Sequence, residues 1–275
     1  MLAAVNGTAI CSTVLALAVH QMRNLAVATQ AVTALFCEAM LASPGFIEPL
    51  IHEEARPHPG QVRVARMLRR LLEGSRMLRH QDESPARKMQ ELAGYPDLGE
   101  LSSPEQGHYL HQDRYHLRTS PQVLGPALED LEAAHASLEI ELNSTTDNPL
   151  VDSKDGRVVH GGNFQGFSVT SAAEKVRDGA SHCGRLLHDQ LVEAIADTTN
   201  NALPLGLTLA DCETDGGLRG LDIGGASYAS ELAFLASRAN HFSRNAESGN
   251  QSINSMALFG ARLALDSVEV LTTLV

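Results

Sequence analysis

Four short stretches of this chain combine polar side chains or glycines in ways that the core of a helical protein does not need. They are Asn6-Gly7-Thr8, the run from Gln112 to Arg118, the run from Gly161 to Gly166, and the run from Glu247 to Ser255. Each contains residue types that can bind or orient a small charged molecule, and each also has a simpler structural interpretation. A single stretch does not decide between the two.

The run from Gln112 to Arg118 carries two arginines, a tyrosine and a glutamine directly before a helix start at Ser120-Pro121. A guanidinium binds a carboxylate through two parallel hydrogen bonds, so Arg118 near Tyr115 suits the carboxylate of a substrate. The structural alternative is a solvated loop that leads into the helix.

The other three stretches offer amides, a carboxylate and glycines. Asn6 stands beside Thr8, whose hydroxyl could simply cap the following helix. Three glycines around Phe164 let the backbone approach a ligand closely, or they connect a hairpin to a helix. Glu247 and Gln251 lie in a polar segment between two expected helices, and the alternative there is a capped loop.

In their order and approximate spacing, the four stretches together resemble the histidine, phenylalanine and tyrosine ammonia-lyases and the related aminomutases. Ser120-Pro121-Gln122 and the run from Thr146 to Leu150 also fit, and the match runs from Leu2 to Val275. The resemblance implies a mainly α-helical, long-helix bundle and a homotetramer whose active sites are shared between subunits. It implies an aromatic amino acid or aryl acid as ligand.

The resemblance also implies the chemistry of the reaction centre. In the family a methylidene-imidazolone ring, formed from an Ala-Ser-Gly triplet, captures the substrate amine, and ammonia then leaves to give an α,β-unsaturated acid. By position, Asn6 is expected to orient this electrophile. Tyr115 and Gln112 are expected to line the reaction centre, with Tyr115 hydrogen-bonding near the electrophile.

Four further residues receive substrate-binding roles from the resemblance. Arg118 is expected to hold the carboxylate, and Phe164 to pack on the substrate side chain. Gln251 and Glu247 are expected to serve the amine end. Gln251 favours phenylalanine or tyrosine as substrate, because histidine-specific members tend to carry a carboxylate there.

The sequence departs from the family pattern in one respect that concerns function. No Ala-Ser-Gly occurs among the 275 residues, and Ala226-Ser227-Tyr228 lacks the glycine needed for cyclisation. In the family, the triplet and a mobile-loop tyrosine lie upstream of the motif at Asn6. Residues 1–275 are therefore expected to form a single partial domain without the electrophile-forming segment and without the C-terminal helices.

Three functions stay open at this point. The chain is part of an aromatic amino acid ammonia-lyase or aminomutase and inactive alone, or a non-catalytic subunit that completes the sites of a longer homologue. The third alternative is a cofactor-free enzyme that reuses the pocket for different chemistry. The sequence separates neither lyase from mutase nor phenylalanine from tyrosine.

Charge and composition exclude other classes of partner. The chain has 33 acidic and 21 basic residues and a formal net charge of -12, which suits neither nucleic acid nor anionic lipid. Its twelve histidines show no metal-ligand spacing, so no metal is expected. Its four cysteines form no CxxC pair and predict reduced, mostly buried thiols in a cytoplasmic protein: Cys11, Cys37, Cys183 and Cys212.

The elements that must position the four stretches are mainly helices. Aromatic residues are only 4% of the chain, while alanine and leucine are plentiful, which favours helix over strand. A small hairpin is expected near 150–160, around Asp155-Gly156, and residues 74–108 are expected to form a surface excursion. Periodicity and cap residues predict helices over 9–42, 61–72, 120–146, 163–200, 224–240 and 252–275.

Three of these helices carry more specific expectations. Ile10 to Val19 could pass for a signal peptide, but no basic residue precedes Arg23, and a buried core helix is predicted instead. The arginines of helix 61–72 are expected to be solvated or salt-bridged rather than to bind an anion. In helix 120–146 a bundle seam is predicted, with His135 filling a gap among Leu124, Leu128, Leu131, Leu138 and Leu142.

Overall fold

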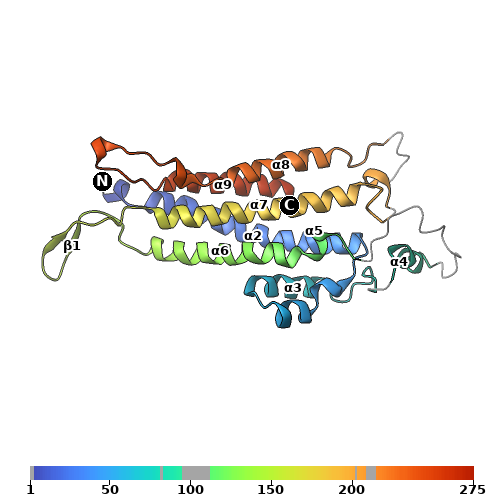
Figure 1. The fold of residues 1–275 in the computed structure, drawn as a ribbon. Coiled ribbons are helices and arrows are strands. Elements are labelled where there is room, and N and C mark those ends of the chain that lie inside the picture. Colours follow the sequence, from blue (N-terminus) through green and yellow to red (C-terminus); the bar gives the residue numbers. More distant parts are fainter. Residues whose placement is uncertain (1–2, 81–82, 95–111, 202, 209–214) are drawn as a thin grey trace. The chain divides into compact units, whose positions relative to one another are not determined.

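The computed structural model describes residues 3–80, 83–94, 112–201, 203–208 and 215–275. Within these ranges nearly all regular structure is helical, and the only strands form one short hairpin (Figure 1). The predicted mainly α fold is confirmed. Cys212 and His108 are among the residues outside the described ranges.

The chain divides into two compact units. Unit 1 comprises residues 1–25, 127–181 and 231–273, and unit 2 comprises the rest. Four helices contribute more than one residue to each unit: α2 (Ala9–Ala39), α6 (Ser120–Leu142), α7 (Phe167–Ile195) and α8 (Leu221–Leu235).

Unit 1 also contains α1 (Ala3–Asn6), α9 (Ala257–Leu274) except for Leu274, and the 3-10 helices η4 (Ala239–Phe242) and η5 (Glu247–Gly249). On α9 the buried residues recur at steps of three and four, which places them on one face of the helix. Those residues are Ala257, Gly260, Ala261, Ala264, Ser267, Val268 and Leu271.

The predicted seam of α6 is right in period but wrong at three positions. Leu128 is only half-buried, His135 is exposed, and Leu142 is 49% exposed. Alanines occupy the inward positions that the leucine pattern left out, because a small side chain lets neighbouring helices approach closely. The buried residues, at alternating steps of three and four, are Leu124, Ala127, Leu131, Ala134 and Leu138.

Unit 2 contains α3 (Pro59–Leu71), α4 (Pro85–Leu92) and α5 (Tyr115–Arg118). It also contains the 3-10 helices η1 (Pro44–Ile47) and η3 (Leu205–Leu207), and a π-helix, η2 (Leu50–Ala55). None of η2, α4 and α5 was predicted. Each is eight residues or shorter, which leaves too few turns for a periodic pattern to appear.

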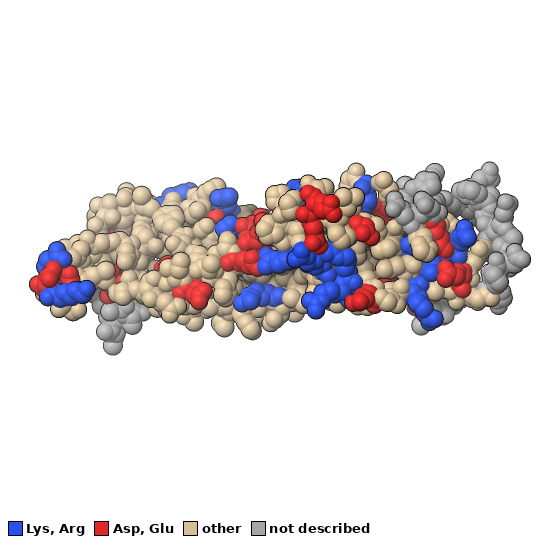
Figure 2. All heavy atoms as spheres, turned by 90° about the horizontal axis from the view of Figure 1, so that it is seen from below, with Lys and Arg blue, Asp and Glu red and all other residues tan. Residues whose placement is uncertain are grey.

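The arginine-rich face of α3 is salt-bridged, as predicted. Arg66 and Arg69 both donate to the Glu53 carboxylate, at 2.6 and 2.5 Å. The Arg66 guanidinium holds the pKa of Glu53 at about 2. Figure 2 shows Lys and Arg side chains beside Asp and Glu side chains over this part of unit 2.

The predicted hairpin is present in unit 1. Strand β1 (Leu150–Asp152) pairs antiparallel with β2 (Arg157–Val159), with Val151 opposite Val158. Gly156 has a φ of +66°, the left-handed conformation that glycine adopts without a Cβ clash in a tight turn.

Several helix ends differ from the predicted ones. The first long helix ends at Ala39, because Leu41 takes a φ of 50° and Ala42 N–H returns to Cys37 O at 2.9 Å. The helix expected to reach residue 200 ends at Ile195, and the one expected from residue 252 begins at Ala257, after Met256 at a φ of 55°. The pattern of hydrophobic residues does not reveal which residues other than glycine adopt the left-handed backbone conformation, so it could not predict these helix ends.

Helix α2 is apolar on more than its buried side. Among the described helices it alone is long and apolar enough to cross a membrane by length and composition, a test that core helices of soluble proteins also pass. Leu15, Ala18 and Val19 are buried, whereas Ile10 is 51% and Leu17 56% exposed. The core-helix prediction therefore holds for one face of the run from Ile10 to Val19 but not for the opposite face.

Candidate active site

The predicted site residues fall into two groups, one in each unit. Gln112, Tyr115 and Arg118 belong to unit 2. The unit 1 group is Asn6, Phe164, Glu247 and Gln251. Each group is held in place by a set of hydrogen bonds within its own unit.

In unit 2, Asp113 anchors the start of the segment that carries Tyr115 and Arg118. Its carboxylate accepts from Arg79 Nη2 at 2.8 Å and from Ser43 N at 2.9 Å. The Arg79 side chain is only 1% exposed. A carboxylate paired with a buried guanidinium fixes the backbone on which α5 begins two residues later.

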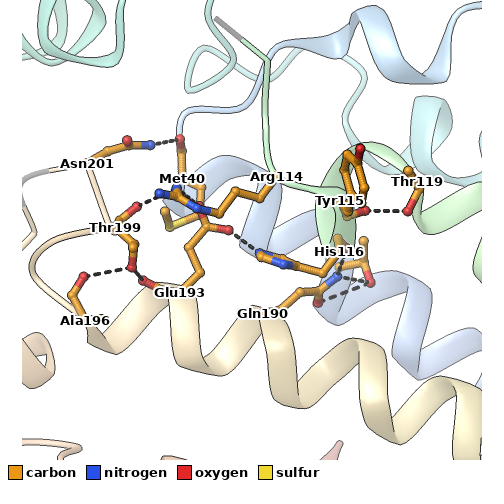
Figure 3. Close-up of polar contacts among 11 residues, drawn as sticks. Met40, Arg114, Tyr115, His116, Thr119, Gln190, Glu193, Ala196, Thr199 and Asn201 are labelled. Carbon is orange, nitrogen blue, oxygen red and sulfur yellow. Dashed lines mark hydrogen bonds and ion pairs between the residues drawn. The ribbon is translucent and has the colours of Figure 1, made fainter. Parts of the chain in front are cut away.

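Arg114 and His116 anchor the same segment from either side of Tyr115 (Figure 3). Arg114 Nη1 donates to Glu193 Oε1 at 2.9 Å, and His116 Nε2 pairs with Glu193 Oε2. Arg114 Nη1 also donates to Thr199 O at 3.4 Å. The Glu193 side chain is 7% exposed, so one buried carboxylate holds both neighbours of Tyr115.

Tyr115 and Arg118 lie on the single turn of α5 and contact each other. Tyr115 is 70% exposed, and Arg118 Cζ lies 4.7 Å from the centre of its ring, a cation–π contact. Among the residues that the structure describes, buried Arg118 Nε has no hydrogen-bond acceptor. A buried donor without an acceptor is costly, and a substrate carboxylate could supply one. Gln112 is exposed at the start of the segment.

In unit 1, the Asn6-Gly7-Thr8 turn packs against residues 141–147. Asn6 Nδ2 donates to Asp147 Oδ1 at 2.7 Å, and Thr8 N donates to Thr146 Oγ1 at 3.1 Å. Thr8 Oγ1 donates to Glu141 Oε1 at 2.6 Å. The turn is thus fixed by a second segment of the chain in addition to any capping of α2.

The Asn6 amide is oriented by this contact. Hydrogen bonds from the Asn6 amide and the Asn148 backbone N–H lower the pKa of Asp147. An ionised Asp147 can only accept, so it selects the Asn6 NH₂ group and turns the amide oxygen the other way. The second amide N–H of Asn6 and its oxygen remain for a ligand.

The glycine-rich loop of Phe164 meets the same segment. Gly161 N donates to Asn148 Oδ1 at 2.8 Å, and Asn163 Nδ2 donates to Thr145 O at 3.3 Å. The Phe164 ring is 38% exposed. Residues 145–148 therefore hold both the Asn6 turn and the Phe164 loop.

Glu247 and Gln251 share a closed loop between α8 and α9. Ala246 and Gln251 exchange backbone hydrogen bonds of 3.0 and 3.2 Å, and Glu247 accepts from Asn250 Nδ2 at 2.8 Å. Glu247 and Ser248 both have a φ of 53°, a strained conformation for residues with a Cβ. Strain of this kind gathers at ligand sites, so the loop fits the predicted role.

Hydrogen bonds connect these unit 1 loops to one another. Gln165 Nε2 donates to Ile253 O at 2.8 Å, which links the Phe164 loop to the segment after Gln251. Figure 1 shows the N-terminus, the β1–β2 hairpin and the α8–α9 loop at the same end of unit 1. The loops that carry the four unit 1 residues thus lie at one end of this unit and are linked by hydrogen bonds.

The three cysteines that the structure describes are poorly suited to nucleophilic chemistry. Cys11, Cys37 and Cys183 are free and buried, and burial raises the pKa of each, that of Cys183 to about 12. Thiols so rarely ionised are poor nucleophiles. In the described ranges, no group of three His, Cys, Asp or Glu side chains could hold a metal ion.

The family of this chain follows from comparison with known proteins. The model of the family described as "Aromatic amino acid lyase" matches the chain over residues 1–275. The chain belongs to the aromatic amino acid lyase family. The resemblance seen in the sequence motifs is thereby confirmed.

Individual relatives agree with this assignment. Phenylalanine ammonia-lyase 1 of Pleurotus ostreatus is 43% identical over 270 residues, which are 98% of this chain and 34% of that protein. The chain thus spans about a third of the length of the curated relatives that it matches.

Solved structures of aromatic amino acid lyases and aminomutases share the fold. Phenylalanine ammonia-lyase from Rhodosporidium toruloides has a TM-score of 0.86 at 40% identity, covering 98% of this chain and 37% of that one. Tyrosine aminomutase from Streptomyces globisporus has a TM-score of 0.86 at 28% identity, covering 98% and 50%. The helical fold of the ammonia-lyases is therefore present in this family member.

Two residues that support the site were not singled out by the sequence. Asp147 was part of a recognised motif but received no role, although it orients Asn6. Glu193 lies within a predicted helix, and a glutamate in a helix is expected to be a solvated surface residue. One sequence feature could have pointed to Glu193: it follows Gln190 by about one helical turn, and the residues around it are apolar.

Proposed function

We propose that this chain contributes the substrate-binding side of an aromatic amino acid ammonia-lyase site. The reaction is elimination from phenylalanine or tyrosine, in which the Cα–N and Cβ–H bonds break and ammonia and an α,β-unsaturated acid form. This elimination is the step that lyases share with aminomutases. Support comes from the family membership and from the geometry around Arg118.

The observation that carries the proposal is the state of Arg118. Its buried Nε has no acceptor among the described residues, and its guanidinium lies over the exposed ring of Tyr115. A carboxylate would accept from the Arg118 guanidinium. In unit 1, the Phe164 ring can provide an apolar contact for an aromatic group. Glu247 and Gln251 then serve the amine.

The methylidene-imidazolone group of the family fits the donor chemistry of this proposal. Such a group would supply the electrophile that turns the amine into a leaving group. The residues that would hold it are Asn6, whose remaining amide N–H can donate to the ring oxygen, and exposed Tyr115 and Gln112. Because the resemblance implies sites shared between subunits, these residues need not come from one chain. This sequence contains no Ala-Ser-Gly from which the group could form.

A second proposal is a subunit that completes the sites of a longer homologue, since the resemblance implies active sites shared between subunits. Co-expression with phenylalanine ammonia-lyase 1 of Pleurotus ostreatus tests it. Co-purification, with activity restored to a partner variant that lacks its own carboxylate-binding arginine, would support this role. Separate elution of the two chains would count against it.

Titration of trans-cinnamate into the chain by calorimetry tests the main proposal. The Arg118→Ala variant should lose about 2–4 kcal/mol of binding free energy, because the ligand charge is left unpaired. Arg157→Ala is the matched control, since Arg157 lies on the exposed β1–β2 hairpin and pairs with Asp152 and Asp155 of the same hairpin. Equal affinity for the wild type and Arg118→Ala would overturn the proposal.

A further inference from the structure

In the segment from Asp113 to Arg118, four side chains are held by neighbouring residues or buried, and the other two, Tyr115 and Arg118, are the predicted site residues. Asp113, Arg114 and His116 are held by ion pairs or hydrogen bonds, and Leu117 is 1% exposed. Tyr115 is 70% exposed between them. The anchors therefore determine where Tyr115 and Arg118 point.

Glu193 is the centre of this anchoring. Its two carboxylate oxygens are divided between Arg114 and His116, the residues on either side of Tyr115 (Figure 3). With 7% exposure, the carboxylate has little access to water, so these charge-assisted contacts are directional and strong. A carboxylate on α7 thus controls a turn that lies 77 residues earlier in the sequence.

Gln190 extends the same contact by one helical turn. Its Nε2 donates to His116 O at 3.1 Å and to Thr33 Oγ1 at 3.2 Å. Residues three apart on a helix share a face, so Gln190 and Glu193 together hold His116 by its backbone and its side chain. The α5 turn then closes through Arg118 N, which donates to Arg114 O at 2.9 Å.

We propose that Glu193 is a positioning residue, which fixes the α5 turn so that Tyr115 and Arg118 face an aryl carboxylate. The identity of that ligand rests on the proposed function, whereas the control of α5 by Glu193 does not. Glu193 touches neither of the two presented side chains, so it acts through Arg114 and His116. Nothing in its role requires the electrophile to be present.

Amide hydrogen exchange of the unliganded chain tests the control of α5 directly. In Glu193→Ala, the amides of residues 117–119 should exchange at least about 10-fold faster than in the wild type, because α5 opens locally. Glu193→Gln keeps one acceptor oxygen at the same length and should fall between the two. Unchanged exchange of this segment in both variants would overturn the proposal.

Glu174→Gln is the matched control. Glu174 is another partly buried carboxylate of α7 between two arginines, 4.0 Å from Arg177 and 3.9 Å from Arg238, within unit 1. Its replacement should leave exchange of residues 117–119 and cinnamate affinity unchanged. An equal effect of Glu174→Gln and Glu193→Gln on this segment would mean general destabilisation, and would overturn the assignment.

Cinnamate affinity separates positioning from stability alone. Glu193→Ala should weaken binding about 10-fold, and should have no further effect once Arg118 is alanine, since both changes disable the same contact. Glu193→Gln should bind cinnamate with an affinity between those of the wild type and Glu193→Ala. If Glu193→Ala does not fold, Glu193→Gln is the variant that tests the proposal. Faster exchange with unchanged affinity would overturn the positioning role. If the wild type binds no cinnamate, the proposed function fails, and the exchange result alone decides for or against Glu193.

Discussion

Asn6 Nδ2 and Asp147 Oδ1 lie 2.7 Å apart although 141 residues separate them in the sequence. This bond joins the first predicted site residue to the segment that also holds the Phe164 loop. It depends on an ionised Asp147, because a carboxylate accepts from both the Asn6 amide and the Asn148 N–H. The order of this part of unit 1 is therefore linked to pH.

The sign of that pH dependence follows from the lowered pKa of Asp147. Its ordinary value is 3.8, and a carboxyl group whose pKa is depressed by folding stabilises the protein above that value. The stabilisation should be lost as pH falls from 3.8 through the lower folded value. The thermal unfolding temperatures of the wild type and Asp147→Asn should differ at pH 6 and become equal at pH values below the folded pKa of Asp147. A difference that stays constant with pH would contradict the assignment.

A methyl group at Gly7 is predicted to disrupt the same contact. A Cβ there would lie 2.6 Å from Thr146 Oγ1 and 2.8 Å from Thr146 O, and the backbone oxygen cannot move aside cheaply. Gly7→Ala should destabilise the chain by about 1–3 kcal/mol, measured by denaturant unfolding. Gly224→Ala is the control, because nothing lies within 4 Å of its added Cβ, and it should be neutral or slightly stabilising.

The fold was more predictable from sequence than the support of the site. The long helices and the hairpin follow from local periodicity and turn residues, which act over a few positions. The contacts of Glu193 and Asp147 span 77 to 141 residues, so no local pattern reveals them. Leu41 and Glu247 adopt positive φ values for which leucine and glutamate give no sequence signal. The site residues themselves came from motif order, and their convergence in one pocket stays a prediction.

We expect the chain to form a homo-oligomer, a tetramer if it follows the family, or a complex with a longer homologue. Large apolar side chains are exposed on it, among them Ile223 at 74%, Phe234 at 76% and Ile140 at 70%. Exposed apolar surface of this kind marks interfaces or aggregation. Light scattering at micromolar concentration should therefore report more than one chain per particle. A monodisperse monomer would argue against it.

The chain alone is predicted to release no ammonia from phenylalanine, tyrosine or histidine. Arg118, Phe164, Glu247 and Gln251 are proposed to bind and orient a substrate, but none of them is an electrophile that makes the amine a good leaving group. The family electrophile needs an Ala-Ser-Gly triplet, which these 275 residues do not contain. Ammonia release at neutral and alkaline pH should equal that of a heat-killed sample, even where the same preparation binds cinnamate. Turnover above that control would show that the chain performs the elimination by another route, and would favour the cofactor-free alternative.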